Sequence, residues 1–157
     1  MQSNQTDQAR GGAQILQGAV TTGISNAVIN GGIQWFLLRD QVVIPLSVDG
    51  ITNDQQTVFG TAVPLAVSIA MILTVVAYLL LKAPKRRFLP DVLWLTVKHG
   101  VFAFGLTVSG AVVWQRLMGS VPVSLATAVI VLGVVAGLVG GVIQFMTIRA
   151  SLLREPE

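Results

Sequence analysis

Cysteine is absent from the 157 residues, and so is most of the charge that a soluble chain carries. The missing thiols exclude disulfides, thiolate catalysis and cysteine-ligated metals. Charged residues make up only 11% of the chain, whereas they make up about a quarter of soluble domains. With 53% hydrophobic residues, a soluble fold would have to expose large apolar patches. The composition therefore predicts a protein whose solvent is a lipid bilayer.

The sequence also lacks the parts of common catalytic sites. No Walker, GxGxxG or HExxH pattern occurs. The long apolar stretches hold no carboxylate, which removes carboxylate-driven proton coupling and two-carboxylate hydrolysis. His99 is the single histidine; we expect an interfacial hydrogen-bonding residue, with a pH sensor, haem ligand or general base as alternatives. We therefore expect no enzyme, no cofactor, no metal site and no nucleic-acid partner.

Four apolar segments are long enough to cross a membrane, since about 20 helical residues span the hydrocarbon core. These spans are residues 13–38, 58–81, 92–114 and 121–148. Asp54, Pro90-Asp91 and Ser120 with Pro122 are helix-start signals for the second, third and fourth spans. The sequence predicts an all-α bundle of four transmembrane helices over residues 13–148. Residues 1–12 form a polar cytoplasmic N-terminus without a cleaved signal peptide, and residues 149–157 form a cytoplasmic tail.

The basic residues predict the orientation. One side of the membrane receives Arg10, the four cations between Lys82 and Arg87, Lys98, Arg149 and Arg154, whereas the other receives only Arg39 and Arg116. Because cytoplasmic loops carry the excess of lysine and arginine, both termini are expected inside. The outer loop of residues 39–57 contains the apolar run Val42–Leu46, which we interpret as a lid or an interfacial segment.

The first span carries an unusual polar face. Thr22, Asn26, Asn30 and Gln34 are spaced by four, and Thr21 and Ser25 flank that row. An unsatisfied amide near the middle of the membrane costs several kcal/mol, so these side chains must face protein, water or a ligand. Interhelical hydrogen bonding is one interpretation. The other is a polar path or binding site lined by Thr22, Ser25, Asn26, Asn30 and Gln34.

Small residues on the fourth span predict close helix packing. Gly133, Gly137 and Gly141 recur at a spacing of four, which lets another helix approach to van der Waals contact. The third span, with Gly105, Ser109 and Gly110, is the expected partner. The ridge is compatible with packing inside one subunit and with packing between subunits.

The two halves of the chain show a short internal match. Trp35 and Arg39 close the first span, and Trp114 and Arg116 close the third. The next segments are Ile44-Pro45-Leu46-Ser47 and Val121-Pro122-Val123-Ser124. Two helical hairpins of the same orientation would be parallel repeats about an axis along the membrane normal. The alternative is that interface residues recur in any membrane hairpin.

Residues 27–36, AVINGGIQWF, followed by a loop and then by residues 58–82, carry a resemblance to known proteins. Over residues 20–82 the chain resembles small uncharacterised inner-membrane proteins of bacteria, some of them labelled permeases. The resemblance implies a location in the bacterial inner (plasma) membrane. We expect a channel or permease-type component with a polar path along the first helix; the alternative is a non-catalytic accessory or scaffolding subunit. Expected partners are membrane lipids and either further copies of the chain or a larger membrane complex.

Overall fold

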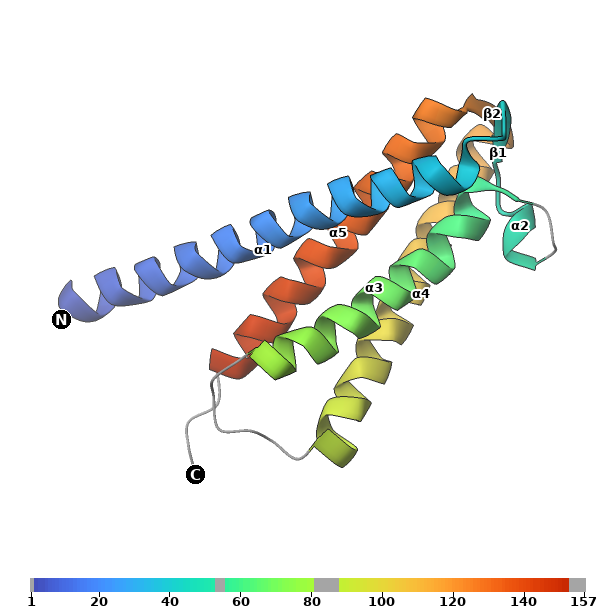
Figure 1. The fold of residues 1–157 in the computed structure, drawn as a ribbon. Helices are drawn as coiled ribbons and strands as arrows, with labels where there is room; N and C mark the ends of the chain where they lie inside the picture. Colours follow the sequence, from blue (N-terminus) through green and yellow to red (C-terminus); the bar gives the residue numbers. More distant parts are fainter. Residues whose placement is uncertain (1, 53–55, 81–87, 153–157) are drawn as a thin grey trace.

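The computed structural model describes residues 2–52, 56–80 and 88–152, and the side chains of residues 12–51, 56–80 and 89–149 (Figure 1). The elements are α1 (Gln2–Leu38), β1 (Val43–Leu46), α2 (Asp49–Thr52), α3 (Val58–Leu80), η1 (Phe88–Val92), α4 (Leu93–Met118), β2 (Val121–Ser124) and α5 (Leu125–Leu152). Apart from turns and one short pair of strands, the described residues are helical, which confirms the predicted helical class. Asp54, the basic connection of residues 82–87 and Arg154 lie outside the described residues.

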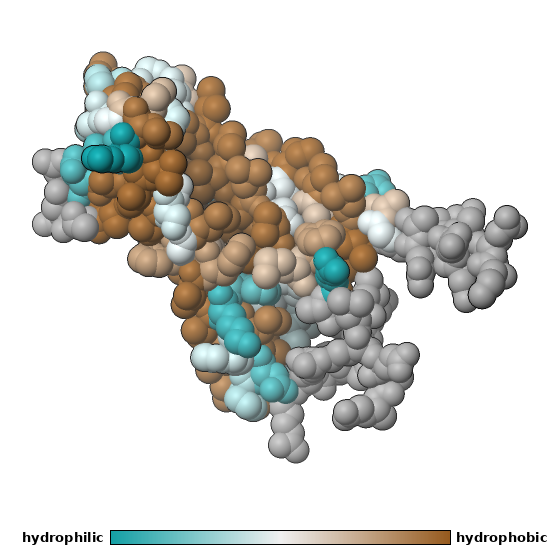
Figure 2. Space-filling view, turned by 180° about the vertical axis from the view of Figure 1, so that it is seen from behind, coloured by the Kyte–Doolittle hydropathy of each residue, from teal (hydrophilic) through white to brown (hydrophobic). Residues whose placement is uncertain are grey.

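Within the described residues, three helices are long and apolar enough to cross a membrane. They are Val58–Leu80, Leu89–Met118 and Leu125–Arg149, with mean hydropathies of 2.4, 1.4 and 2.5. The prediction of a membrane protein is thereby confirmed at the level of three helices. On the face drawn in Figure 2, hydrophobic residues form a broad surface and strongly hydrophilic residues gather toward its ends. Such an exterior suits hydrocarbon rather than water.

Several helices begin or end at residues other than those predicted from the sequence. The helix predicted from residue 121 begins at Leu125, because the Ser124 hydroxyl accepts the Thr127 N–H at 3.3 Å and caps α5. In the same way Thr57 caps α3 by accepting the Gly60 N–H at 3.0 Å. Helix α4 continues to Met118 rather than to residue 114. Helix α1 begins at Gln2, well before the expected residue 13.

The long helices form an open row instead of a closed bundle. Helix α1 packs along α5, α5 lies beside α3, and α3 packs against α4 (Figure 1). Helices α4 and α5 touch only marginally. Helices α1 and α4 therefore stand at the two ends of the row, each with a broad side free of other described parts of the chain.

The apolar run that we interpreted as a lid or an interfacial segment contains a strand that joins the two halves of the chain. Strand β1 pairs antiparallel with β2, and Pro45 lies opposite Pro122. Since proline has no N–H, placing both prolines on one rung leaves the neighbouring rungs free to form their hydrogen bonds. Ile44 and Leu46 are buried, so the strand also closes the outer end of the apolar core.

The core has two parts that differ in side-chain size. Near the strands, a cluster of larger residues includes Leu38, Ile44, Val58, Phe59 and Leu132. Farther along the helices, alanines from three helices meet in a second cluster that includes Ala66, Ala70, Ala103 and Ala136. Alanine at these contacts lets α4 and α5 each approach α3 closely, which is how membrane helices gain van der Waals energy.

The strand register predicts a specific disulfide. Val43 lies opposite Ser124, and Cα atoms of opposed antiparallel residues are about 4.5–5.5 Å apart, within reach of a disulfide. In this cysteine-free chain, we expect Val43→Cys with Ser124→Cys to oxidise and to link the tryptic peptides 40–82 and 117–149, read by mass spectrometry. Val42→Cys with Ser124→Cys is the control, because a shift of one residue turns the side chain to the other face. Equal yields from both pairs would contradict the register.

Candidate functional site: the polar face of α1

Helix α1 is held against α5 by backbone contact at matching small residues. The ridge Gly133, Gly137 and Gly141 of α5 faces Ala19, Gly23, Ala27 and Gly31 of α1. A Cβ on Gly23 would lie 2.9 Å from the Gly137 carbonyl oxygen, and a Cβ on Gly137 would lie 3.0 Å from the Gly23 oxygen. A Cβ is essentially never as close to a backbone oxygen as 2.9 Å, so the contact requires glycine at position 23, and a Cβ at position 137 would push the two helices slightly apart.

The predicted partner of this ridge, the helix that carries Gly105, is wrong. A Cβ added at Gly105 or Gly110 of α4 would meet nothing within 4 Å in the described part of the chain, and Ser109 is exposed. Gly105 therefore does not serve helix packing inside this chain. The second stripe, Ala19-xxx-Gly23-xxx-Ala27-xxx-Gly31, has the same spacing of four and was readable in the sequence. The polar row on the same helix has the same spacing and is the more conspicuous pattern.

Two amides of the polar row of α1 donate hydrogen bonds within their own helix. The Asn26 Nδ2 donates to the Thr22 carbonyl at 2.9 Å, and the Asn30 Nδ2 donates to the Asn26 carbonyl at 3.0 Å. Asn26 also rests on α5, because a Cβ on Gly140 would lie 3.0 Å from its Nδ2. Thr22, Asn26 and Asn30 are half-buried at the edge of the α1–α5 contact. This row therefore borders the contact between α1 and α5.

Two residues of the face point away from the other described helices. Thr21 and Ser25 lie one turn apart and are exposed, and Gln14 and Gln17 continue the exposed polar line toward the N-terminus. Leu16, Val20, Ile24 and Val28 are exposed as well, so the outer side of α1 is mixed. Of the five predicted site residues, Ser25 alone is fully presented to the surroundings.

The outer end of α1 contains a buried polar atom without a partner. Gln34 is 6% exposed, and its Oε1 accepts no hydrogen bond from the described residues. Trp114 Nε1, near the same end of α4, is buried and donates none within the described chain; its ring meets Phe59 edge-on at 6.4 Å. Such groups normally pair with protein or water. Gln34 lies one turn before Leu38, a member of the outer core cluster, so it belongs to packing in this chain rather than to an open path.

His99 forms a second polar contact, between α3 and α4. Its Nδ1 lies 2.7 Å from Thr74 Oγ1, whose hydroxyl donates to the Ala70 carbonyl at 2.7 Å. With that hydroxyl proton engaged, the imidazole must carry its proton on Nδ1 and donate to Thr74. Both side chains are buried. His99 is thus a bridge between helices rather than the interfacial residue we expected.

The described residues contain no cluster of three histidine or acidic side chains that could hold a metal ion. No carboxylate contacts the Thr74–His99 pair among the hydrogen bonds of the described chain. What the arrangement offers is a helix with one side fixed to α5 and one mixed polar side open.

No protein-family model, curated protein or solved structure matches this chain.

Proposed function

We propose that α1 is a fourth membrane-spanning helix, with both termini cytoplasmic, in a bacterial inner membrane. In support, α1 follows α5 from Gly18 against Ile148 to Gly31 against Val129. Those 14 residues rise about 21 Å, most of a hydrocarbon core about 30 Å thick. Since α5 is apolar enough to span, a helix packed along it lies at the same depth. The excess of lysine and arginine on one side supports the orientation.

We also propose that the two halves are parallel repeats. A shift of 77 residues maps Pro45 onto Pro122, and it maps the Ile44–Val123 pair onto Val121–Leu46, so the strand pairing maps onto itself. The burial pattern of residues 61–70 recurs unchanged at residues 131–140, a shift of 70. The difference of seven residues falls where the first half carries α2 and its loop. This relation supports a pseudo-two-fold axis between α3 and α5.

For the biochemical role, we propose a non-catalytic subunit that assembles with other membrane helices through the outer side of α1. The observation that carries this proposal is the exposure of Thr21 and Ser25 on α1, a helix that packs against α5 on one side only. Hydroxyl groups in hydrocarbon favour a partner that accepts or donates a hydrogen bond. Each such bond contributes only about 0.6 kcal/mol. The two hydroxyls therefore determine which side of α1 binds a partner more than they determine how tightly the partner binds.

A transport role is the second candidate, and one observation favours it. The amides of Asn26 and Asn30, at the edge of the α1–α5 contact, border the exposed hydroxyls of Thr21 and Ser25 on the surface of α1. A polar path would then form only between subunits that meet on this side. Water and glycerol permeability of proteoliposomes tests this candidate, and permeability equal to that of protein-free liposomes would eliminate it.

Replacing Thr21 and Ser25 together by leucine tests the assembly role. We expect the double variant to retain less of its partner, or of its oligomer, than the wild type on gentle extraction of native membranes, because leucine leaves the docking side without a hydrogen bond. Ser109→Leu, which also removes an exposed hydroxyl but on α4, is the matched control and should leave the assembly intact. The measurement is the mass of the extracted particle, and a monomeric wild-type particle without partner would contradict the proposal.

A further inference from the structure

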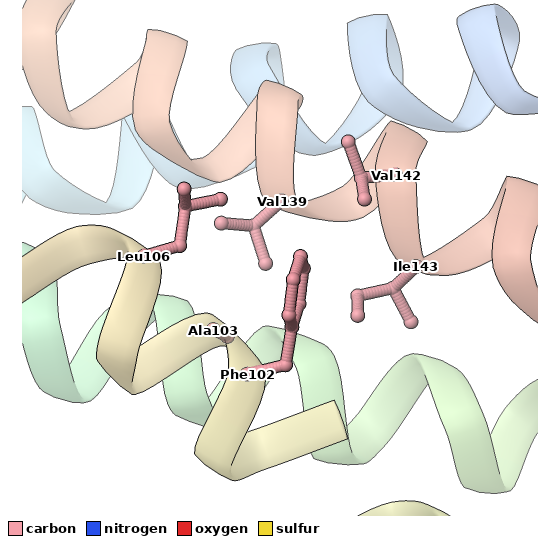
Figure 3. Close-up of a pocket in the computed structure, with 6 residues that line it drawn as sticks. All are labelled: Phe102, Ala103, Leu106, Val139, Val142 and Ile143. Carbon is pink, nitrogen blue, oxygen red and sulfur yellow. The ribbon is translucent and has the colours of Figure 1, made fainter. Parts of the chain in front are cut away.

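A groove lies between α4 and α5, where the two helices barely touch. Six apolar side chains line it, and Figure 3 shows them converging from both helices: Phe102, Ala103, Leu106, Val139, Val142 and Ile143. It is a shallow depression that is open to the surroundings and not an enclosed cavity. The groove exists because α3 holds both helices while the buried Ala103, only 1% exposed, fills little of the gap between them.

The lining of the groove suits a hydrocarbon chain. None of the six side chains can form a hydrogen bond. Both walls belong to helices that are apolar enough to span a membrane, and Phe102, Leu106 and Val142 are exposed at its mouth. The groove therefore opens sideways, at membrane depth, toward the lipid. An acyl chain lying in it would gain van der Waals contact with three sides.

One end of the groove is positively charged. Lys98 lies one turn before Phe102, and Arg149 lies seven residues after Val142, so each cation is on the groove side of its helix. Helices α4 and α5 run in opposite directions, which brings both cations to the cytoplasmic end. Both are exposed. Lys98 Nζ sits 5.2 Å over the Trp94 ring, and no ion pair to either cation is present among the described residues.

We propose that this groove binds one anionic phospholipid of the inner leaflet, with an acyl chain between α4 and α5 and the phosphate between Lys98 and Arg149. Arginine and lysine are the side chains that recognise phosphate, and the aromatic Trp94 suits the headgroup level. A free phosphate ion would use only the cations, and a zwitterionic lipid would use mainly the groove. The site is distinct from the outer side of α1 and does not depend on the assembly role.

Native mass spectrometry of the purified full chain in mild detergent tests the site. We expect phosphatidylglycerol to bind at least fivefold more tightly than phosphatidylcholine of the same chains, and inorganic phosphate to show no measurable binding. The double variant Lys98→Gln with Arg149→Gln should bring phosphatidylglycerol down to the level of phosphatidylcholine. Arg39→Gln, at the other end of the molecule, should change nothing.

The groove itself is tested by filling it. Val142→Trp should weaken binding of both lipids at least fivefold, whereas Val134→Trp, an exposed valine of α5 outside the groove, should not. A monodisperse particle with the wild-type melting temperature shows that the variant is folded. Should Val142→Trp fail that check, the charge variants decide alone. Equal affinity for the two lipids, phosphate binding as tight as lipid binding, or full binding by the charge variants would overturn the proposal.

Discussion

Replacing Gly137 by isoleucine will separate α1 from α5 and destabilise the protein by about 3 kcal/mol, at the upper end of what overpacking costs. A Cβ at this position already meets the Ala27 Cβ and the Gly23 oxygen at 3.0 Å each. The further atoms of isoleucine can find room only if the helices move apart. The whole ridge then loses its contact, because each of its glycines depends on the same close approach.

The matched control for this variant is Gly105→Ile on α4. It makes the same substitution in a membrane-depth helix where a Cβ meets nothing within 4 Å in the described chain. Stability is measured by reversible unfolding in mixed detergent and SDS, followed by circular dichroism. Equal stability of the two variants would show that the α1–α5 contact does not rest on the ridge.

Truncating Leu132 to alanine is expected to have the second largest effect, about 2 kcal/mol, near the lower end of the range for buried leucines. Leu132 is 0% exposed in the outer core cluster. The cost stays near that lower end because unfolding in a bilayer moves the Leu132 side chain from the protein core into lipid, which is equally apolar. The loss is then mainly that of packing contacts around the cavity.

Leu138→Ala provides the control for that cavity. Leu138 lies on the same helix and is 64% exposed, so its removal should change the free energy of unfolding by less than about 0.5 kcal/mol, as for ordinary surface substitutions. The same unfolding titration in detergent and SDS measures both variants. Loss of stability in Leu138→Ala as large as in Leu132→Ala would mean that the exposed side of α5 is packed in solution.

The sequence was sufficient to predict those features that follow from composition and period. Low charge and long apolar runs indicate membrane helices because burial in hydrocarbon needs no tertiary detail, and α3 begins at the predicted Val58. The spacing of four at Gly133 indicates a close helix contact for the same reason. The internal match around Pro45 and Pro122 pointed to segments that turned out to be paired.

Features that depend on tertiary partners could not be predicted in this way. The segment that begins at Val121 is a strand and not, as predicted, the start of a helix. Its sequence alone is compatible with a helix start, because it is apolar and contains proline, and the strand β1 that pairs with it lies far away in sequence. The sequence did not predict α1 as the partner of the glycine ridge, because small residues indicate that another helix lies close but not which helix it is. Asn26 has its hydrogen bonds within α1, which only the rotamer of its side chain reveals.

The central claim is that α1 lies along α5 inside the membrane, and one disulfide tests it most directly. In the chain with Ala27→Cys and Gly137→Cys, the two Cβ atoms lie near 3.0 Å, so a slight separation reaches the 3.5–4.5 Å of a disulfide. Oxidation in native membranes should give a monomeric band whose tryptic peptides 11–39 and 117–149 are linked. The pair Ala27→Cys with Gly105→Cys should stay reduced. Absence of the first link, or a link found only between two chains, would contradict the account.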